Sequence, residues 1–181
     1  MSTCRSLTFS ATLFPFLVKV SSRIAILEKC MLEIIERIES HTGTPTSSLT
    51  LPFDQRQKSR LRVILDNGDE ASIILNRGTV LRDGDMLRSS CGKLIEVHAA
   101  LEAVSIVRES NCHLLSRACY HLGNRHVPLQ IGDESLCYLR DHVLDDMVRS
   151  FGLVVDHQEA SFEPEPGAYH KEGNHQHSHE H

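Results

Sequence analysis

The chain has 181 residues, and 19 Lys and Arg against 24 Asp and Glu give a formal net charge of −5 with His neutral. This balance excludes a strongly basic nucleic-acid-binding protein. The longest mostly apolar run, residues 7–18, is too short for a transmembrane helix and contains Pro15. We therefore expect a cytoplasmic protein with neither a membrane nor a nucleic-acid partner.

Two residue types indicate where function lies. The six Cys include no C-x-x-C pair, and a chain of this length can build a core without disulfides, so we expect reduced thiols. His is unusually frequent, with 12 copies, five of which fall in residues 170–181. Such His enrichment is typical of a metal-binding segment.

The first 40 residues give the weakest pattern. Residues 1–30 do not resemble a signal peptide, because Lys19 and Arg23 follow the apolar stretch. We interpret them as an N-terminal extension, either disordered or the product of a misassigned start codon. In residues 25–39 the apolar spacing slightly favours a helix, although Leu32, Ile34 and Ile38 also fit a strand interrupted by Glu36.

Residues 50–101 predict a small all-β module. Asn67-Gly68 separates two runs of alternating apolar residues, which is typical of a β-hairpin. Its apolar faces are Leu61, Val63 and Leu65 on one strand and Ala71, Ile73 and Leu75 on the other. Further turn signals at residues 77–78, 83–85 and 91–93 separate more short strands.

From residue 102 onward, strands alternate with helices. Strands are predicted at residues 104–107, 127–131 and 136–139, with a closing strand that opens at 153–155. Helices are predicted to follow the N-caps Asn111 and Asp141 and to end at Gly123 and Gly152. The order β-α-β-β-α-β matches a ferredoxin-like arrangement, so the fold class is α+β. Residues 164–181 are too polar to fold and predict a disordered His-rich tail.

The tail places His175, His177, His179 and His181 at alternate positions, where a flexible segment can gather them around one ion. Imidazole nitrogen suits Ni(II), Cu(II) and Zn(II). The alternative interpretation is a purification tag, although the segment is not a run of consecutive His residues.

A second candidate ligand lies in the body of the chain. His126 immediately precedes the strand predicted at 127–131, whose apolar face is Val127, Leu129 and Ile131, so its side chain should point away from the core. One imidazole makes a poor metal site, but near the axis of a two-fold dimer it meets its own copy. The alternative is an ordinary surface His.

Other polar residues are harder to assign. His142 begins the second helix and could ligate a metal or simply be exposed, and His121 suits the C-terminal end of the first helix. Four more, His41, His98, His113 and His157, have no organised neighbours in the sequence. Solvated charges are expected at Asp145, Asp146, Glu163 and Glu165, and core positions at Cys112 and Cys119. We find no nucleophile with a base and an orienting group, so the sequence does not favour an enzyme.

Several segments together resemble the UreE family of urease accessory proteins, which are nickel metallochaperones. The resemblance runs from about Met31 to His181, and its motifs lie at residues 75–78, 83–87, 120–131, 141–147, 162–165 and 167–170. It implies a small β domain similar to a peptide-binding module at 31–101, a ferredoxin-like metal-binding and dimerisation domain at 102–163, and a His-rich tail at 164–181. It also implies that residues 32–35 form a strand and that 1–30 are an unusual extension.

The resemblance also implies the ligands and the role. His126 corresponds to the nickel ligand contributed by both subunits of a homodimer, His170 to a tail ligand, and His142 to a peripheral metal-binding His. Arg140 stands where some relatives have another His, which disfavours a peripheral His-x-His site. The implied role is delivery of Ni(II) to apo-urease together with other accessory proteins, including the GTPase UreG, with Zn(II) or Cu(II) able to bind in vitro.

Three alternatives remain at this point. A passive nickel or zinc store would use only the His-rich tail. An interaction module would use an edge of the β domain and would not need the tail His residues. A metallohydrolase would need a carboxylate base beside His126, which Arg125 and Val127 do not supply.

Overall fold

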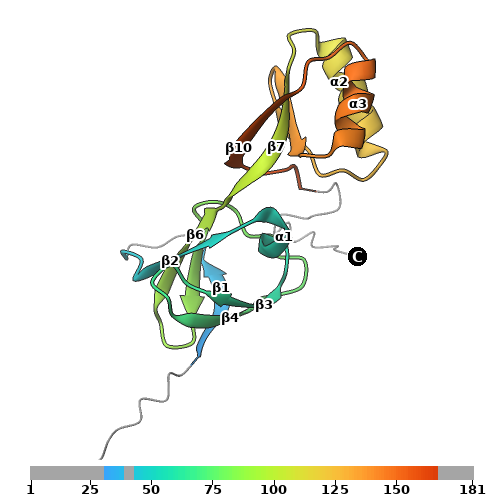
Figure 1. The fold of residues 1–181 in the computed structure, drawn as a ribbon. Coiled ribbons are helices and arrows are strands. Elements are labelled where there is room, and N and C mark those ends of the chain that lie inside the picture. The colour runs from blue at the N-terminus through green and yellow to red at the C-terminus, as the bar shows by residue number, and fades with distance from the viewer. Residues whose placement is uncertain (1–30, 39–42, 167–181) are drawn as a thin grey trace, which may run out of the picture. The chain divides into compact units, whose positions relative to one another are not determined.

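The computed structural model describes residues 31–38 and 43–166, in two sheets and three helices (Figure 1). The predictions for the extension at 1–30 and for the His-rich tail after Pro166 lie outside the described residues. Within the described ranges, no helix is long and apolar enough to cross a membrane. The cysteines of this part, Cys91, Cys112, Cys119 and Cys137, are free thiols.

The first sheet has six strands in the order β2-β6-β5-β1-β4-β3. Its strands are β1 (Leu32–Ile38), β2 (Ser47–Leu51), β3 (Arg60–Ile64), β4 (Glu70–Ile74), β5 (Met86–Ser89) and β6 (Leu94–Ala99). A short helix, α1 (Phe53–Arg56), follows β2. The mostly β module predicted from the alternating pattern is therefore confirmed.

The predicted hairpin is the β3–β4 pair. The two strands are antiparallel, the Leu65 N–H donates to the Asp69 carbonyl at 2.8 Å, and Gly68 has a φ of 85°. Val63 and Leu65 are buried with Ala71 and Ile73 in the core of this sheet. An Asn-Gly pair suits such a turn because the required positive φ costs glycine little.

The helix that local spacing favours at residues 25–39 is wrong over its described part. Residues 32–38 form strand β1, which pairs in parallel with β4 and antiparallel with β5. Only Ile34 of this strand is fully buried. Because β1 lies between two partners, hydrogen bonds along both of its edges override a weak local preference.

The second sheet is antiparallel, with strand order β10-β7-β9-β8. Its elements are β7 (Leu101–Arg108), α2 (Cys112–Gly123), β8 (Gln130–Gly132), β9 (Ser135–Leu139), α3 (His142–Ser150) and β10 (Asp156–Ser161). Residues of both helices pack with residues of the sheet in one apolar core (Figure 1). The predicted N-caps Asn111 and Asp141 both accept hydrogen bonds from the first turn of their helices.

Two strand predictions in this part need correction. The strand predicted at 127–131 is shorter, since β8 spans only Gln130–Gly132, and Pro128 offers no N–H for pairing. The closing strand begins at Asp156 rather than at 153–155. Leu153 packs into the core, but residues 153–155 connect α3 to β10 without a strand partner.

Candidate metal centre

The end of helix α2 determines how His126 is presented. The His126 N–H donates to the Gly123 carbonyl at 2.9 Å, and the Val127 N–H donates to the Leu122 carbonyl at 3.3 Å. This pair of bonds is the Schellman motif, in which the residue after the helix adopts a left-handed conformation. Leu122 and Val127 also pack together in the core, as this motif prefers.

His126 is the left-handed residue of this motif, with a φ of 59°. It is the only non-glycine residue with positive φ in the part of the chain that the structure describes. Such a conformation costs an L-residue about 1–2 kcal/mol, which is why glycine is usual there. The side chain is exposed as predicted, but the reason is the helix end rather than strand alternation.

The surface near His126 is apolar. Tyr120 is 68% exposed and Ile131 is 47% exposed. Both line an open groove that also includes Cys112, Leu115, Ser116 and Cys119. Cys112 is exposed and Cys119 half-buried, so the core prediction for Cys112 is wrong. Exposed apolar side chains on a groove are typical of an interaction surface.

His121 and His142 occupy different environments. The His121 ring lies 4.9 Å from the Phe151 ring and 5.2 Å from the Tyr120 ring between centroids, so it is part of an aromatic cluster. His142 is exposed at the first position of α3. The Asp141 carboxylate beside it accepts hydrogen bonds from the Val143 and Leu144 N–H groups, which confirms its capping role.

Asp145 is not the solvated charge that the sequence predicts. It is only 2% exposed, and it accepts hydrogen bonds from the Tyr138 hydroxyl at 2.9 Å and from His157 Nε2 at 2.7 Å. Burial acts to raise the pKa of Asp145, but the neighbouring Ser105 hydroxyl, His157 and Tyr138 outweigh it and keep that pKa below its usual value. His157 therefore has an organised partner, contrary to prediction, and Asp145 joins α3 to β9 and β10.

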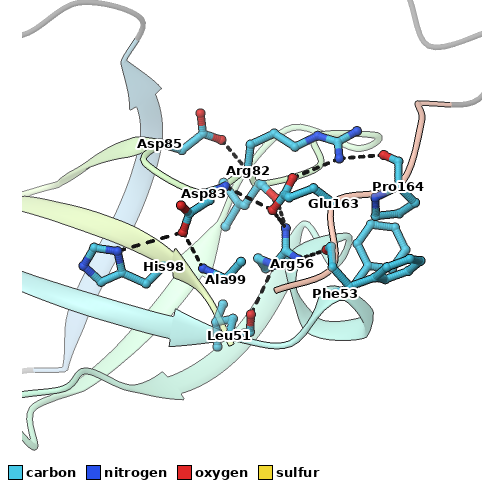
Figure 2. Close-up of polar contacts among 12 residues, drawn as sticks. Leu51, Phe53, Arg56, Arg82, Asp83, Asp85, His98, Ala99, Glu163 and Pro164 are labelled. Atoms are coloured by element: carbon cyan, nitrogen blue, oxygen red, sulfur yellow. Dashed lines mark hydrogen bonds and ion pairs between the residues drawn. The ribbon is translucent and has the colours of Figure 1, made fainter. Parts of the chain in front are cut away.

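Glu163 is likewise not a free charge. Its carboxylate accepts hydrogen bonds from Arg56 Nη1 and, at 3.1 Å, from Arg82 Nη1 (Figure 2). On the other side of the same segment, the Glu163 N–H donates to Gln130 Oε1 at 2.9 Å and the Glu165 N–H donates to the Leu129 carbonyl at 2.7 Å. The start of the His-rich segment is thus attached three residues after His126.

Sequence reasoning missed these two clusters for a simple reason. Arg56 and Glu163 are 107 residues apart, and Asp145 is 12 residues from His157. No local spacing indicates either pair. A buried Arg next to a β-strand end would be a usable signal only if its partner were already known.

The described residues of one protomer do not form a complete metal site. Within residues 31–38 and 43–166, no three His, Cys, Asp or Glu side chains come together as a metal-binding group. The tail candidates His170, His175, His177, His179 and His181 lie outside the described residues. An ion at His126 would therefore need ligands from the tail or from a second copy of the chain.

Comparison with known proteins covers almost the whole described chain. Residues 31–100 match the family model described as UreE urease accessory protein, N-terminal domain, and residues 102–181 match the corresponding C-terminal domain. Urease accessory protein UreE of Alkalilimnicola ehrlichii is 55% identical over 139 residues, which are 77% of this chain and 85% of that protein. The proteins of the same name from Citrobacter koseri and Pseudomonas putida are 52% identical over 153 residues and 54% identical over 140 residues. These alignments cover 83% and 77% of this chain and 100% and 86% of the two relatives, respectively.

Proposed function

Because the chain belongs to the UreE family of urease accessory proteins, we propose that it is a metallochaperone that carries Ni(II) to apo-urease. The observation that carries this proposal is His126, an exposed imidazole held in a backbone conformation that disfavours any residue except glycine. A strained residue is retained when the surrounding structure or a function requires it. Nickel is the cargo in this proposal.

The proposed domain division follows the resemblance. We assign a small β domain to 31–101, a ferredoxin-like metal-binding and dimerisation domain to 102–163, a disordered His-rich tail to 164–181, and an extension to 1–30. The order β10-β7-β9-β8, with one helix after β7 and one after β9, supports the ferredoxin-like assignment.

The proposed central site lies between two copies of the chain. In a homodimer, two symmetry-related His126 side chains would each supply one nitrogen. The exposed Tyr120 and Ile131 beside the α2 groove support dimerisation through this face, because apolar area of this kind gains from being covered.

His170 is the proposed tail ligand of the same site. It lies five residues after Glu165, whose N–H is bound to Leu129, and an extended chain of that length reaches about 17 Å. His126 lies three residues before Leu129, at most about 10 Å along the chain. The tail of each protomer can therefore reach the His126 site. His175, His177, His179 and His181 are further tail ligands, and His142 is a peripheral one.

Neutral imidazole explains both the binding and the release of the cargo. Nitrogen ligands bind Ni(II), and they also bind Zn(II) and Cu(II) in vitro, so delivery partners must provide the selectivity for nickel. Each ligand must be deprotonated, so binding should weaken as the pH falls through about 6.5. The proposed partners are apo-urease and the accessory proteins including UreG, in the cytoplasm, with no nucleic acid, no membrane and no catalytic step.

Calorimetric titration with Ni²⁺ tests the proposal, using wild type, His126→Ala and His113→Ala. His113 is a matched control, because it is also exposed and also belongs to α2. We expect His126→Ala to lose one tight ion per dimer and His113→Ala to keep it. The tight ion should also be lost from wild type near pH 5.

The opposite result would favour another function. If His126→Ala keeps every tight ion, the tail alone binds the metal, as expected for a passive nickel or zinc store. Transfer from the loaded protein to apo-urease then separates the two functions, since a store would not increase urease activation.

A further inference from the structure

Residues 162–165, which we call the tail root, are held by both sheets. Phe162 is fully buried, and its ring meets the Phe53 ring edge-on at 5.5 Å. Phe162 also belongs to a small apolar cluster with Val104, Ile106 and Cys137. The tail root is therefore part of the packed protein, whereas the His residues all come after it.

Arg56 supplies the main polar contact of the tail root. Its side chain is fully buried, with Nε donating to the Leu51 carbonyl and Nη1 donating to the Leu81 carbonyl, both at 3.1 Å. The same guanidinium donates to the Phe162 carbonyl and to the Glu163 carboxylate (Figure 2). A buried cation needs such a counter-charge, because an unpaired one is very unfavourable.

A second arginine holds the next residue. Arg82 Nη1 donates to the Glu163 carboxylate at 3.1 Å and to the Pro164 carbonyl at 2.7 Å (Figure 2). The Asp83 N–H adds a third donor to Glu163, at 3.2 Å. Glu163 thus receives hydrogen bonds from a helix and a loop of the first sheet, more than 80 residues away in sequence.

The other side of the tail root faces the His126 loop. The backbone N–H groups of Glu163 and Glu165 donate to Gln130 and Leu129, respectively. These two bonds place the last held residue of the tail root next to the segment that begins with His126. Any ligand in the tail starts its path from this point.

We propose that Arg56 and Arg82 are positioning residues for the metal tail, acting through Glu163. Their contacts fix the starting point of the tail beside His126 and so raise the local concentration of tail imidazole there. This inference rests on the proposed function, because it assumes that tail imidazoles and His126 share an ion. Neither arginine touches the metal.

The size of the effect follows from the length of free chain. With the tail root held, His170 lies five residues beyond Glu165, and with it released, nine residues beyond Ser161, the last residue of β10. Effective concentration falls at least as the −3/2 power of tether length, so release lowers it about 2–3-fold for one tail. For two tails in a dimer, the expected loss in nickel affinity is about sixfold.

The experiment measures the Kd of the tight Ni²⁺ ion, by chelator competition, in wild type and Glu163→Gln. Glu36→Gln is the matched control, since Glu36 also pairs with an arginine of the first sheet, Arg88, but lies outside the tail root. We expect Glu163→Gln to weaken binding about sixfold and Glu36→Gln to leave it unchanged. Amide exchange at Glu163 and Glu165 should become faster only in Glu163→Gln.

A second background separates positioning from general stability. In the full chain with all five tail His residues changed to Ala, Glu163→Gln should have no further effect on the Kd. An equal loss in both backgrounds, or no loss in either, would overturn the proposal. Since Glu163→Gln leaves Arg56 with a weaker partner, Arg82→Met provides a variant with no buried charge, and it should change the Kd in the same direction and the same background.

The proposed function has its own control. If His126→Ala retains the tight ion, the shared site itself is wrong. If His126→Ala loses that ion while Glu163→Gln and Arg82→Met both bind as wild type does, only the positioning role is wrong.

Discussion

His126 combines an unfavourable backbone angle with a useful position. Glycine would satisfy the two hydrogen bonds that end α2 equally well, because they use only backbone atoms. The imidazole adds nothing to this turn that glycine lacks, so its presence points to a role in solvent. The left-handed angle also directs the side chain away from the core formed by Leu122 and Val127.

We predict that His126→Gly stabilises the protein and removes the tight nickel site. Relief of the left-handed strain, less the greater freedom of glycine in the unfolded chain, should raise the free energy of unfolding by up to about 1 kcal/mol. His126→Ala keeps the strain and should bring no such gain. Urea denaturation measures the difference, and an alanine variant at least as stable as the glycine variant would contradict it.

The buried Asp145 gives a pH-dependent prediction. Its pKa is lowered in the folded protein, so its contribution to stability is complete above about pH 4 and is lost as the pH falls through the lowered value. Tyr138→Phe removes one donor, which should cost about 1–3 kcal/mol at pH 7. It should also move the pKa of Asp145 back toward its usual value, so the variant loses less stability than wild type between pH 5 and pH 3.

Urea denaturation at these three pH values checks this prediction. Asp146→Asn is the control, because Asp146 is exposed on the same helix and pairs only with Arg149 at the surface. A steeper acid dependence in Tyr138→Phe than in wild type would mean that the Tyr138 hydroxyl does not lower the pKa of Asp145.

At the scale of elements, the two helices depend on residues outside their own spans. Asn111 and Asp141 each accept two backbone N–H groups that the first turn cannot satisfy within the helix. α3 has only nine residues, a length that is not stable alone in water. Its cap and its buried face must therefore both contribute.

We predict that Asp141→Ala lowers the free energy of unfolding by about 1 kcal/mol, because two first-turn N–H groups lose their acceptor. Asp141→Asn keeps an acceptor and loses only the favourable charge at the helix N-terminus, so it should cost about 0.3–1 kcal/mol. Guanidinium denaturation compares both variants with Ser150→Ala at the exposed far end of α3. The prediction fails if Asp141→Ala is no less stable than Asp141→Asn.

Elements with local signals could be predicted from the sequence, and those without could not. The hairpin at Asn67-Gly68 and the helix starts at Asn111 and Asp141 each depend on a few adjacent residues. Strand β1 depends on partners more than 35 residues away, and helical spacing alone misassigned it. β8 is short because Pro128 interrupts a correct alternating pattern.

The whole molecule contains a small apolar cluster built from both parts of the chain. Phe53, which follows the first strands, packs with Val104, Cys137 and Phe162 of the second part. Burial raises the pKa of the Cys137 thiol to about 11, as expected for a reduced thiol inside this cluster. Beside the cluster, Arg56 and Glu163 connect the same two parts through charge.

We predict that Phe162→Ala lowers the free energy of unfolding by about 3–5 kcal/mol, because it removes a fully buried ring that supports this cluster. Differential scanning calorimetry should also show a broader transition, since the two main cores then unfold less cooperatively. Leu101→Ala, at a residue 71% exposed, is the control and should change stability by less than about 0.5 kcal/mol. A small effect of Phe162→Ala would show that the cluster contributes little.

At this scale, the sequence gave the candidate ligand but not its setting. His126 could be proposed as an exposed ligand from its neighbours alone. The different fates of Asp145, which is buried, and Asp146, which is exposed, could not, because adjacent carboxylates look alike without the positions of Tyr138 and His157. The same holds for Glu163, whose arginine partners are more than 80 residues away.

The tail root also affects solubility. β8 is an edge strand, and an open edge offers unpaired backbone groups to other chains. The Glu165 N–H occupies the Leu129 carbonyl at the start of this edge, while Pro164 and Pro166 offer no N–H for further pairing. Residues 162–166 therefore protect the second sheet from edge-to-edge association, and a protein that carries metal-gathering imidazoles remains protected at its most exposed strand.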